Sequence, residues 1–124
     1  MIDHVELFVA DPGQSVAFFG AALSPLGYGL HVEGETNGFG ADAAHLDFWL
    51  RKGGPSQPLP HVAFNCASRA MVDAGHAAAL AAGGSENGAP RLMPHIHANY
   101  YAGFVRDPDG HNIEFVCHRA VDAN

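Results

Sequence analysis

Basic residues and cysteines are both scarce in this sequence. Six Lys and Arg stand against 13 Asp and Glu among 124 residues, which gives a formal net charge of −7 at pH 7. Nucleic-acid binding requires a basic surface, so this balance argues against a nucleic-acid partner and against attraction to an anionic membrane. Two cysteines, Cys66 and Cys117, make no disulfide framework. We expect them to be buried free thiols in a reducing cytoplasm.

Long apolar runs are also missing. No run approaches the ~20 apolar residues that a membrane-spanning helix requires, and the first residues, MIDHVELFV, are strand-like and lack the parts of a signal peptide. What is present is 48% hydrophobic and 15% charged residues, which is typical of a globular chain. The length predicts one domain with a real core. We therefore expect a single cytoplasmic domain.

The first half of the chain predicts one strand, one helix and three further strands. The run HVELFV at 4–9 alternates between two faces, and Asp11 with Pro12 opens a helix that ends before Pro25. Strands are expected at 28–33, after a Gly-rich turn within 34–41, and at 44–50. The segment 51–60 holds two Gly and three Pro, which is typical of a linker.

The second half repeats this order. HVAFNC at 61–66 predicts a strand, and Ser68 caps a helix over 71–82 that stops at two glycines. Residues 85–97 look irregular, with one short strand followed by a loop. The run YYAGFVRDPDGHNIEFVC at 100–117 predicts a β-hairpin around an Asp-Pro-Asp-Gly turn.

Glu114 is a charged residue in the middle of the last apolar strand. Alternation places it on one face with Asn112 and Val116, opposite Ile113 and Phe115. The carboxylate either faces water or has a partner, because an unpaired buried charge is costly.

Internal similarity suggests the partner. An offset of 57 residues aligns His4 with His61, and an offset of 67 aligns Asp47 with Glu114; ten extra residues within 85–97 account for the change. If a helix covers the apolar face of each half, these four polar side chains all lie on the uncovered face. Two imidazoles and two carboxylates suit a divalent ion such as zinc, nickel, iron or manganese. The nine histidines of this short chain point to the same chemistry.

Three segments resemble a known family. HVELFVADP near the start, HVAF in the middle and FVRDPDGHNIEF near the end are similar to the vicinal oxygen chelate superfamily, which includes glyoxalase I, extradiol dioxygenases, fosfomycin-modifying enzymes and bleomycin-resistance proteins. The resemblance implies an α+β fold in which two βαβββ modules form a curved mixed sheet with helices on its outer face. It implies one glyoxalase-like domain over 1–124, with modules at about 1–52 and about 60–119 and a linker at about 53–59.

The resemblance also implies a metal site. His4 matches the ligand of the first strand, His61 that of the fifth strand and Glu114 that of the last strand. Asp47 stands where glyoxalase-like members carry Glu and is one methylene shorter. Direct ligation by Asp47, contact through water, and a hydrogen bond to Arg or Tyr all remain open.

Candidate catalytic residues are Glu114, which would move a proton, and His97 and Tyr101, which lie in or beside the inserted loop where substrate contacts are common. His45 could replace Asp47, and His95 is a weaker candidate than His97. We expect the other histidines to lie at the surface: His31, His76, His111 and His118.

The leading functional interpretation is a metal-dependent lyase or isomerase of glyoxalase type, acting on a small substrate that chelates the metal through adjacent oxygens. A dioxygenase or a thiol transferase of the same superfamily is an alternative. So is a metal-free drug- or metabolite-binding protein of the bleomycin-resistance kind, although such proteins generally lack this His/Glu set. The site could close within one chain or across a homodimer.

Overall fold

The computed structural model describes residues 1–121, and its elements follow the expected order. The strands are β1 Val5–Val9, β2 Gly29–Val32, β3 Thr36–Asp42, β4 His45–Lys52, β5 His61–Asn65, β6 Ser85–Leu92, β7 Tyr101–Arg106 and β8 Asn112–Cys117; the helices are α1 Pro12–Leu23, the 3-10 helix η1 Ser24–Leu26 and α2 Arg69–Ala81. Each half therefore runs strand, helix and three strands. The α+β class with two βαβββ modules is confirmed.

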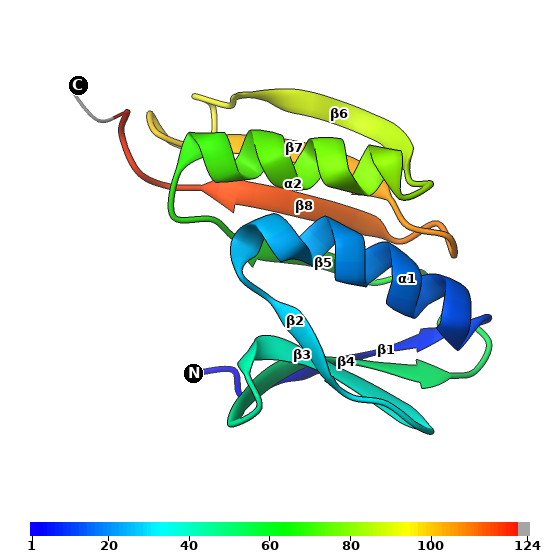
Figure 1. The fold of residues 1–124 in the computed structure, drawn as a ribbon. Coiled ribbons are helices and arrows are strands. Elements are labelled where there is room, and N and C mark those ends of the chain that lie inside the picture. The colour runs from blue at the N-terminus through cyan, green and yellow to red at the C-terminus, as the bar shows by residue number, and fades with distance from the viewer. Residues whose placement is uncertain (122–124) are drawn as a thin grey trace.

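Each module builds its own mixed sheet of four strands. The strand orders are β1-β4-β3-β2 and β5-β8-β7-β6. In each sheet the first strand of the module lies at the edge and pairs in parallel with the last strand of the same module, β1 with β4 and β5 with β8. Figure 1 shows α1 and α2 next to each other on one side of the two sheets, with β1 and β5 as the strands at which the sheets approach. Because both helices lie on this side, the opposite face of each sheet stays uncovered by helix.

The core joins the two modules. Phe48 of β4 packs edge to face on Phe19 of α1, with ring centroids 4.9 Å apart, and on Phe64 of β5, with centroids 5.1 Å apart. Phe19 and Phe48 are almost wholly buried, and burial of such a ring contributes about 1.5–3 kcal/mol. The apolar set predicted from alternation, including Leu7, Phe64 and Phe115, lies in this core.

Two strands are longer than their sequences suggest. The Gly-rich segment was expected to be mostly turn, yet β3 runs for seven residues. A Cβ atom on Gly40 would lie 1.8 Å from the carbonyl oxygen of His45, so this close strand contact requires glycine. Strand β6 covers eight residues where we expected irregular structure. It is an edge strand with register shifts around Gly88, and an edge position tolerates Pro90.

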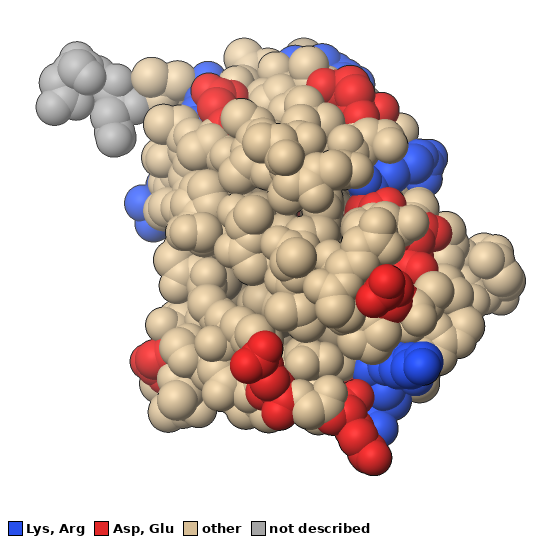
Figure 2. Space-filling model, turned by 45° about the vertical axis from the view of Figure 1, so that its right-hand side comes forward, with Lys and Arg blue, Asp and Glu red and all other residues tan. Residues whose placement is uncertain are grey.

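The surface agrees with the charge balance. On the face shown in Figure 2, Lys and Arg form small separate groups and no continuous basic surface. Within residues 1–121, no helix is both long and apolar enough to cross a membrane.

Candidate functional site

His61 and Glu114 form the centre of the candidate site. Nε2 of His61, at the start of β5, lies 2.9 Å from Oε1 of Glu114 on the neighbouring strand β8. The Glu114 side chain is only 4% exposed, whereas that of His61 is 46% exposed. The carboxylate therefore does not face water, and the partner expected for it is an imidazole that solvent can reach.

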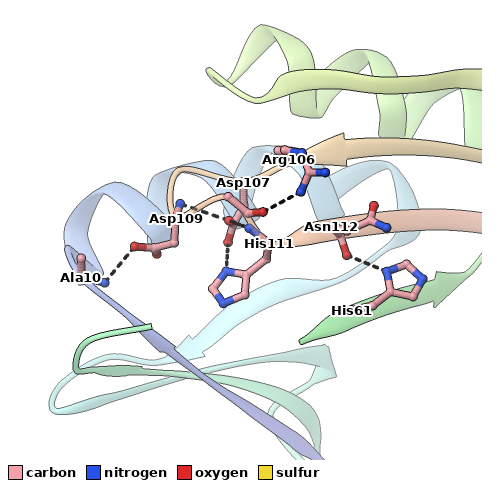
Figure 3. Close-up of polar contacts among 8 residues, drawn as sticks. Ala10, His61, Arg106, Asp107, Asp109, His111 and Asn112 are labelled. Atoms are coloured by element: carbon pink, nitrogen blue, oxygen red, sulfur yellow. Dashed lines mark hydrogen bonds and ion pairs between the residues drawn. The ribbon is translucent and has the colours of Figure 1, made fainter. Parts of the chain in front are cut away.

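Backbone contacts fix the orientation of the His61 ring. Its Nδ1 lies 2.8 Å from the carbonyl oxygen of Asn112 (Figure 3). A carbonyl oxygen only accepts, so Nδ1 carries the proton and the lone pair of a neutral ring sits on Nε2, facing Glu114. Phe104 of β7 stacks on the ring with centroids 6.4 Å apart. The Asn112 side chain is held in turn by Asn87 at 3.1 Å.

Tyr100, just before β7, contacts the second oxygen of Glu114. Its hydroxyl donates a short hydrogen bond to Oε2, and burial together with this bond raises the pKa of Tyr100 to about 12. The Tyr100 ring lies edge-on to His97 and His118, whose facing nitrogens are 2.9 Å apart. Tyr100 therefore lies between His97 and Glu114 in space and contacts both of them.

The first module carries a similar arrangement at His4 and Asp47. Val5 of β1 is paired with Phe48 of β4, so the parallel register extended by one residue places the backbone of His4 level with that of Asp47. Oδ2 of Asp47 accepts a hydrogen bond from the Tyr28 hydroxyl at 2.6 Å. Burial and this bond raise the pKa of Tyr28 to about 12. Nδ1 of His4 is 2.6 Å from Asp3. The tyrosine partner that the sequence left open for Asp47 is thus Tyr28.

The two modules differ in register by two residues. Val5 and Val62 are 57 positions apart, but their strand partners Phe48 and Ile113 are 65 apart. Asp47 consequently stands level with His4, whereas Glu114 stands two residues beyond the level of His61. A shift of two keeps every side chain on its face, so the alternation in the sequence is preserved while the geometry of the two pairs differs.

One chain does not bring the four candidate ligands together. Among residues 1–121, a group of three or more ligand-type side chains occurs only at Asp107, Asp109 and His111. His61 and Glu114 instead lie on the second sheet, whereas Asp47 lies on the first sheet and His4 just before its strand β1. The sequence left open whether the site closes within one chain or across a homodimer, and the full set of four ligands stays a prediction.

Tyr101 lies on the opposite side of the sheet from Glu114. Its hydroxyl donates to Asp73 of α2 at 2.6 Å, and the guanidinium of Arg69 lies over its ring. The register explains this placement, because Glu114 is paired with Phe104 and alternation from Phe104 leads back to Tyr100. Tyr101 therefore points away from Glu114 and its catalytic role stays a prediction, whereas Tyr100 is the tyrosine that contacts the carboxylate. Alternation counted outward from the turn is the signal that identifies it.

The acidic turn before β8 is a structural element. Asp107 accepts from the backbone N–H groups of Asp109 and His111 and binds Nδ1 of His111 at 2.8 Å (Figure 3). Asp109 accepts from the N–H of Ala10, which links the turn to the end of β1. Burial raises the pKa of Asp107, and the hydrogen bond from His111 partly opposes this effect.

Two histidines expected at the surface are buried. His111 is wholly buried, and His76 is buried and binds Glu86. The surface position predicted for these two residues is therefore wrong.

The donor set at His61 and Glu114 fits a divalent ion. Two ligand atoms that each lie about 2.1 Å from one ion, about 90° apart, are about 3.0 Å from each other. The 2.9 Å between Nε2 and Oε1 is close to that separation, is shorter than the about 3.4 Å of a tetrahedral site, and is equally the length of a hydrogen bond. The imidazole Nε2 and the carboxylate Oε1 face each other there, and either a proton or a metal ion between them would join the two groups. One imidazole nitrogen and one carboxylate oxygen suit zinc, nickel, iron and manganese alike.

Comparison with known proteins identifies the family. The family model described as the glyoxalase/bleomycin resistance protein/dioxygenase superfamily matches residues 1–115. The chain belongs to this superfamily. The resemblance of its three segments to the vicinal oxygen chelate proteins is thereby confirmed. No curated protein matches the sequence significantly.

Solved structures of superfamily members share the fold. A glyoxalase/bleomycin resistance protein from Albidiferax ferrireducens T118 is 28% identical, with a TM-score of 0.79 over 96% of this chain and 99% of that one. A superfamily enzyme from Burkholderia phytofirmans PsJN is 16% identical, with a TM-score of 0.72 over 94% and 98%. A mutant of the fosfomycin resistance protein from Listeria monocytogenes, complexed with Mn(II) and a dihydroxypropylphosphonic acid, is 18% identical, with a TM-score of 0.69 over 94% and 88%.

Proposed function

We propose that this protein is a metal-dependent enzyme of the superfamily, a lyase or isomerase acting on a small substrate that chelates the metal through adjacent oxygens. The observation that carries the proposal is the contact of 2.9 Å between His61 Nε2 and Glu114 Oε1. A carboxylate as deeply buried as Glu114 is costly without a cation, and the imidazole beside it supplies the second donor of a metal site.

Each residue has a distinct role in this proposal. A bound divalent ion would supply Lewis acidity to the substrate oxygens. His61 would hold the ion through Nε2, because the Asn112 carbonyl engages its Nδ1. Glu114 would hold the ion through Oε1, and when that oxygen leaves the ion it would be placed to exchange a proton with the neighbouring carbon of the substrate. His97, beside Tyr100 in a solvent-exposed turn, is placed to contact substrate.

A second copy of the chain would complete the ligand set. His4 and Asp47 lie on the other sheet, with the Tyr28 hydroxyl on Asp47. In a homodimer with twofold symmetry, the first pair of one copy can face the second pair of the other, which produces two equivalent sites. Exposed apolar side chains, including Ile2, Phe8 and Ile96, offer surface for such an association.

Metal content tests the proposal. The purified protein, reconstituted separately with Zn²⁺, Ni²⁺, Fe²⁺ and Mn²⁺ and then dialysed, should retain about one ion per site with at least one of these metals. Glu114→Gln should lose the ion, because it removes the charge and one ligand oxygen. Elemental analysis of wild type and variant measures both.

Glu86→Gln is the matched control. Glu86 also lies 2.9 Å from an imidazole Nε2, that of His76, but this histidine belongs to α2 on the helix side of the sheet. The Glu86→Gln substitution should therefore leave the metal content unchanged. Absence of metal under every reconstitution would contradict the enzyme and favour the metal-free binding protein. Retention of iron only, with oxygen consumption on a catechol, would favour the dioxygenase.

A further inference from the structure

The position of Tyr100 is fixed by its own module. The turn between β6 and β7 closes on it, with Met93 N–H donating to the Tyr100 carbonyl at 2.8 Å and Tyr100 N–H donating to His97 at 3.2 Å. The ring is bounded by the edges of His97 and His118, at centroid distances of 5.5 and 5.2 Å. Both the backbone and the ring of Tyr100 are therefore held by contacts within the chain itself.

The hydroxyl of this fixed ring makes the two oxygens of Glu114 different. Oε2 accepts from Tyr100, while Oε1 faces Nε2 of His61. A carboxylate free of such a contact can bind a metal ion through both oxygens, and one whose second oxygen is held by a donor binds through the first alone.

We propose that Tyr100 is a positioning residue for the metal site, which holds Oε2 of Glu114 and presents Oε1 together with His61 Nε2 as a two-atom chelate. This inference rests on the proposed function. It concerns how this chain prepares its carboxylate and assigns Tyr100 no contact with the reacting atoms.

The first module uses the same device from a different place in the chain. Tyr28 follows η1 and donates to Oδ2 of Asp47 at 2.6 Å, whereas Tyr100 precedes β7. Under the 57-residue offset these tyrosines are not equivalent positions, so duplication alone does not explain why each candidate carboxylate has a tyrosine hydroxyl. A shared need to fix one carboxylate oxygen does explain it.

Binding of Co²⁺ and Mn²⁺ to wild type, Tyr100→Phe and Tyr101→Phe tests the inference. Tyr101→Phe is the matched control because it removes the same hydroxyl from the adjacent residue, on the helix side of the sheet. Removal of an outer-shell partner typically weakens metal binding about 10- to 100-fold. We expect that loss in Tyr100→Phe, measured by competition with a chelator, and wild-type affinity in Tyr101→Phe. Circular dichroism and thermal midpoints check that both variants fold.

The visible spectrum of Co²⁺ at saturation provides a readout that loss of stability alone does not change. Release of Oε2 should raise the coordination number and weaken the absorption bands in Tyr100→Phe, with the Tyr101→Phe spectrum unaltered. Wild-type affinity and spectrum in Tyr100→Phe would overturn the inference and leave the metal-dependent function standing. Failure of the wild-type protein itself to bind any divalent ion would overturn both.

Discussion

At the residue scale, Cys66 illustrates how burial controls the chemistry of one side chain. Its thiol is 2% exposed, and Sγ lies 3.7 Å from the Phe64 carbonyl oxygen. Burial, and to a smaller extent the neighbouring Cys117 sulfur, raise the pKa of Cys66 to about 12. Both cysteines are free and buried, as the sequence predicts. The thiolate is the reactive form, so the native protein should protect this residue.

We therefore predict that Cys66 in a Cys117→Ser variant reacts with a disulfide reagent at pH 8 at least about a hundredfold more slowly in the native state than in urea. Burial, the larger cause of the raised pKa, remains in this variant and leaves far less thiolate in the native state. The rate should increase as the pH rises toward the pKa. Absorbance of the released thiol measures it. Equal rates in the native and unfolded states would show that the thiol is not protected.

At the scale of elements, the two helices differ in how closely they approach their surroundings. A Cβ atom on Gly75 of α2 would lie 2.7 Å from the Phe115 ring on β8, while one on Gly20 of α1 would meet nothing within 4 Å. Gly75 thus allows α2 to pack directly on the strand that carries Glu114. Gly20 is an ordinary helical glycine at the surface side of α1.

These two glycines give a matched pair of variants. Gly20→Ala should raise the free energy of unfolding by about 0.5–1 kcal/mol, because alanine has the higher helix propensity. Gly75→Ala gains the same propensity but must displace a buried ring, and overpacking of this kind costs about 1–3 kcal/mol, so we expect a net loss. Urea denaturation of both variants measures the difference. Stabilisation of similar size in both would contradict the close packing of α2 on β8.

Elements with a clear period could be predicted from the sequence, and those built on glycine could not. The hairpin of β7 and β8 follows from alternation around an Asp-Pro-Asp-Gly turn. The length of strand β3 did not follow, because glycine in a strand looks like turn sequence although Gly40 is needed for the approach to His45. Register is a further limit: the shift of two residues between modules leaves the alternation intact and is visible only in the strand pairs.

At the scale of the molecule, the sequence identified the candidate ligands but not which of them meet. Pattern and resemblance placed His4, Asp47, His61 and Glu114 on the uncovered faces, and the structure divides them into two pairs. Which face a side chain occupies depends on local alternation. Whether the pairs meet depends on how the modules associate, which local sequence does not encode.

Mixing two inactive variants tests whether a second copy completes the site. If the site is shared, a dimer of one His4→Ala chain and one Glu114→Ala chain carries both defects in one site and none in the other. Random exchange of subunits should then restore about a quarter of the wild-type metal content, because half of the dimers are mixed and each has one intact site. Elemental analysis after joint refolding measures the recovery.

The control mixture combines His61→Ala with Glu114→Ala, two defects within the same pair. Each mixed dimer then has one defect in each site, so no recovery is expected if the site is shared. If the four ligands instead belonged to one chain, every site in both mixtures would contain a defect and neither mixture would recover metal. Recovery in the first mixture alone therefore requires that the His4 and Asp47 pair of one copy acts with the His61 and Glu114 pair of another, because no rearrangement within a single chain separates these two results.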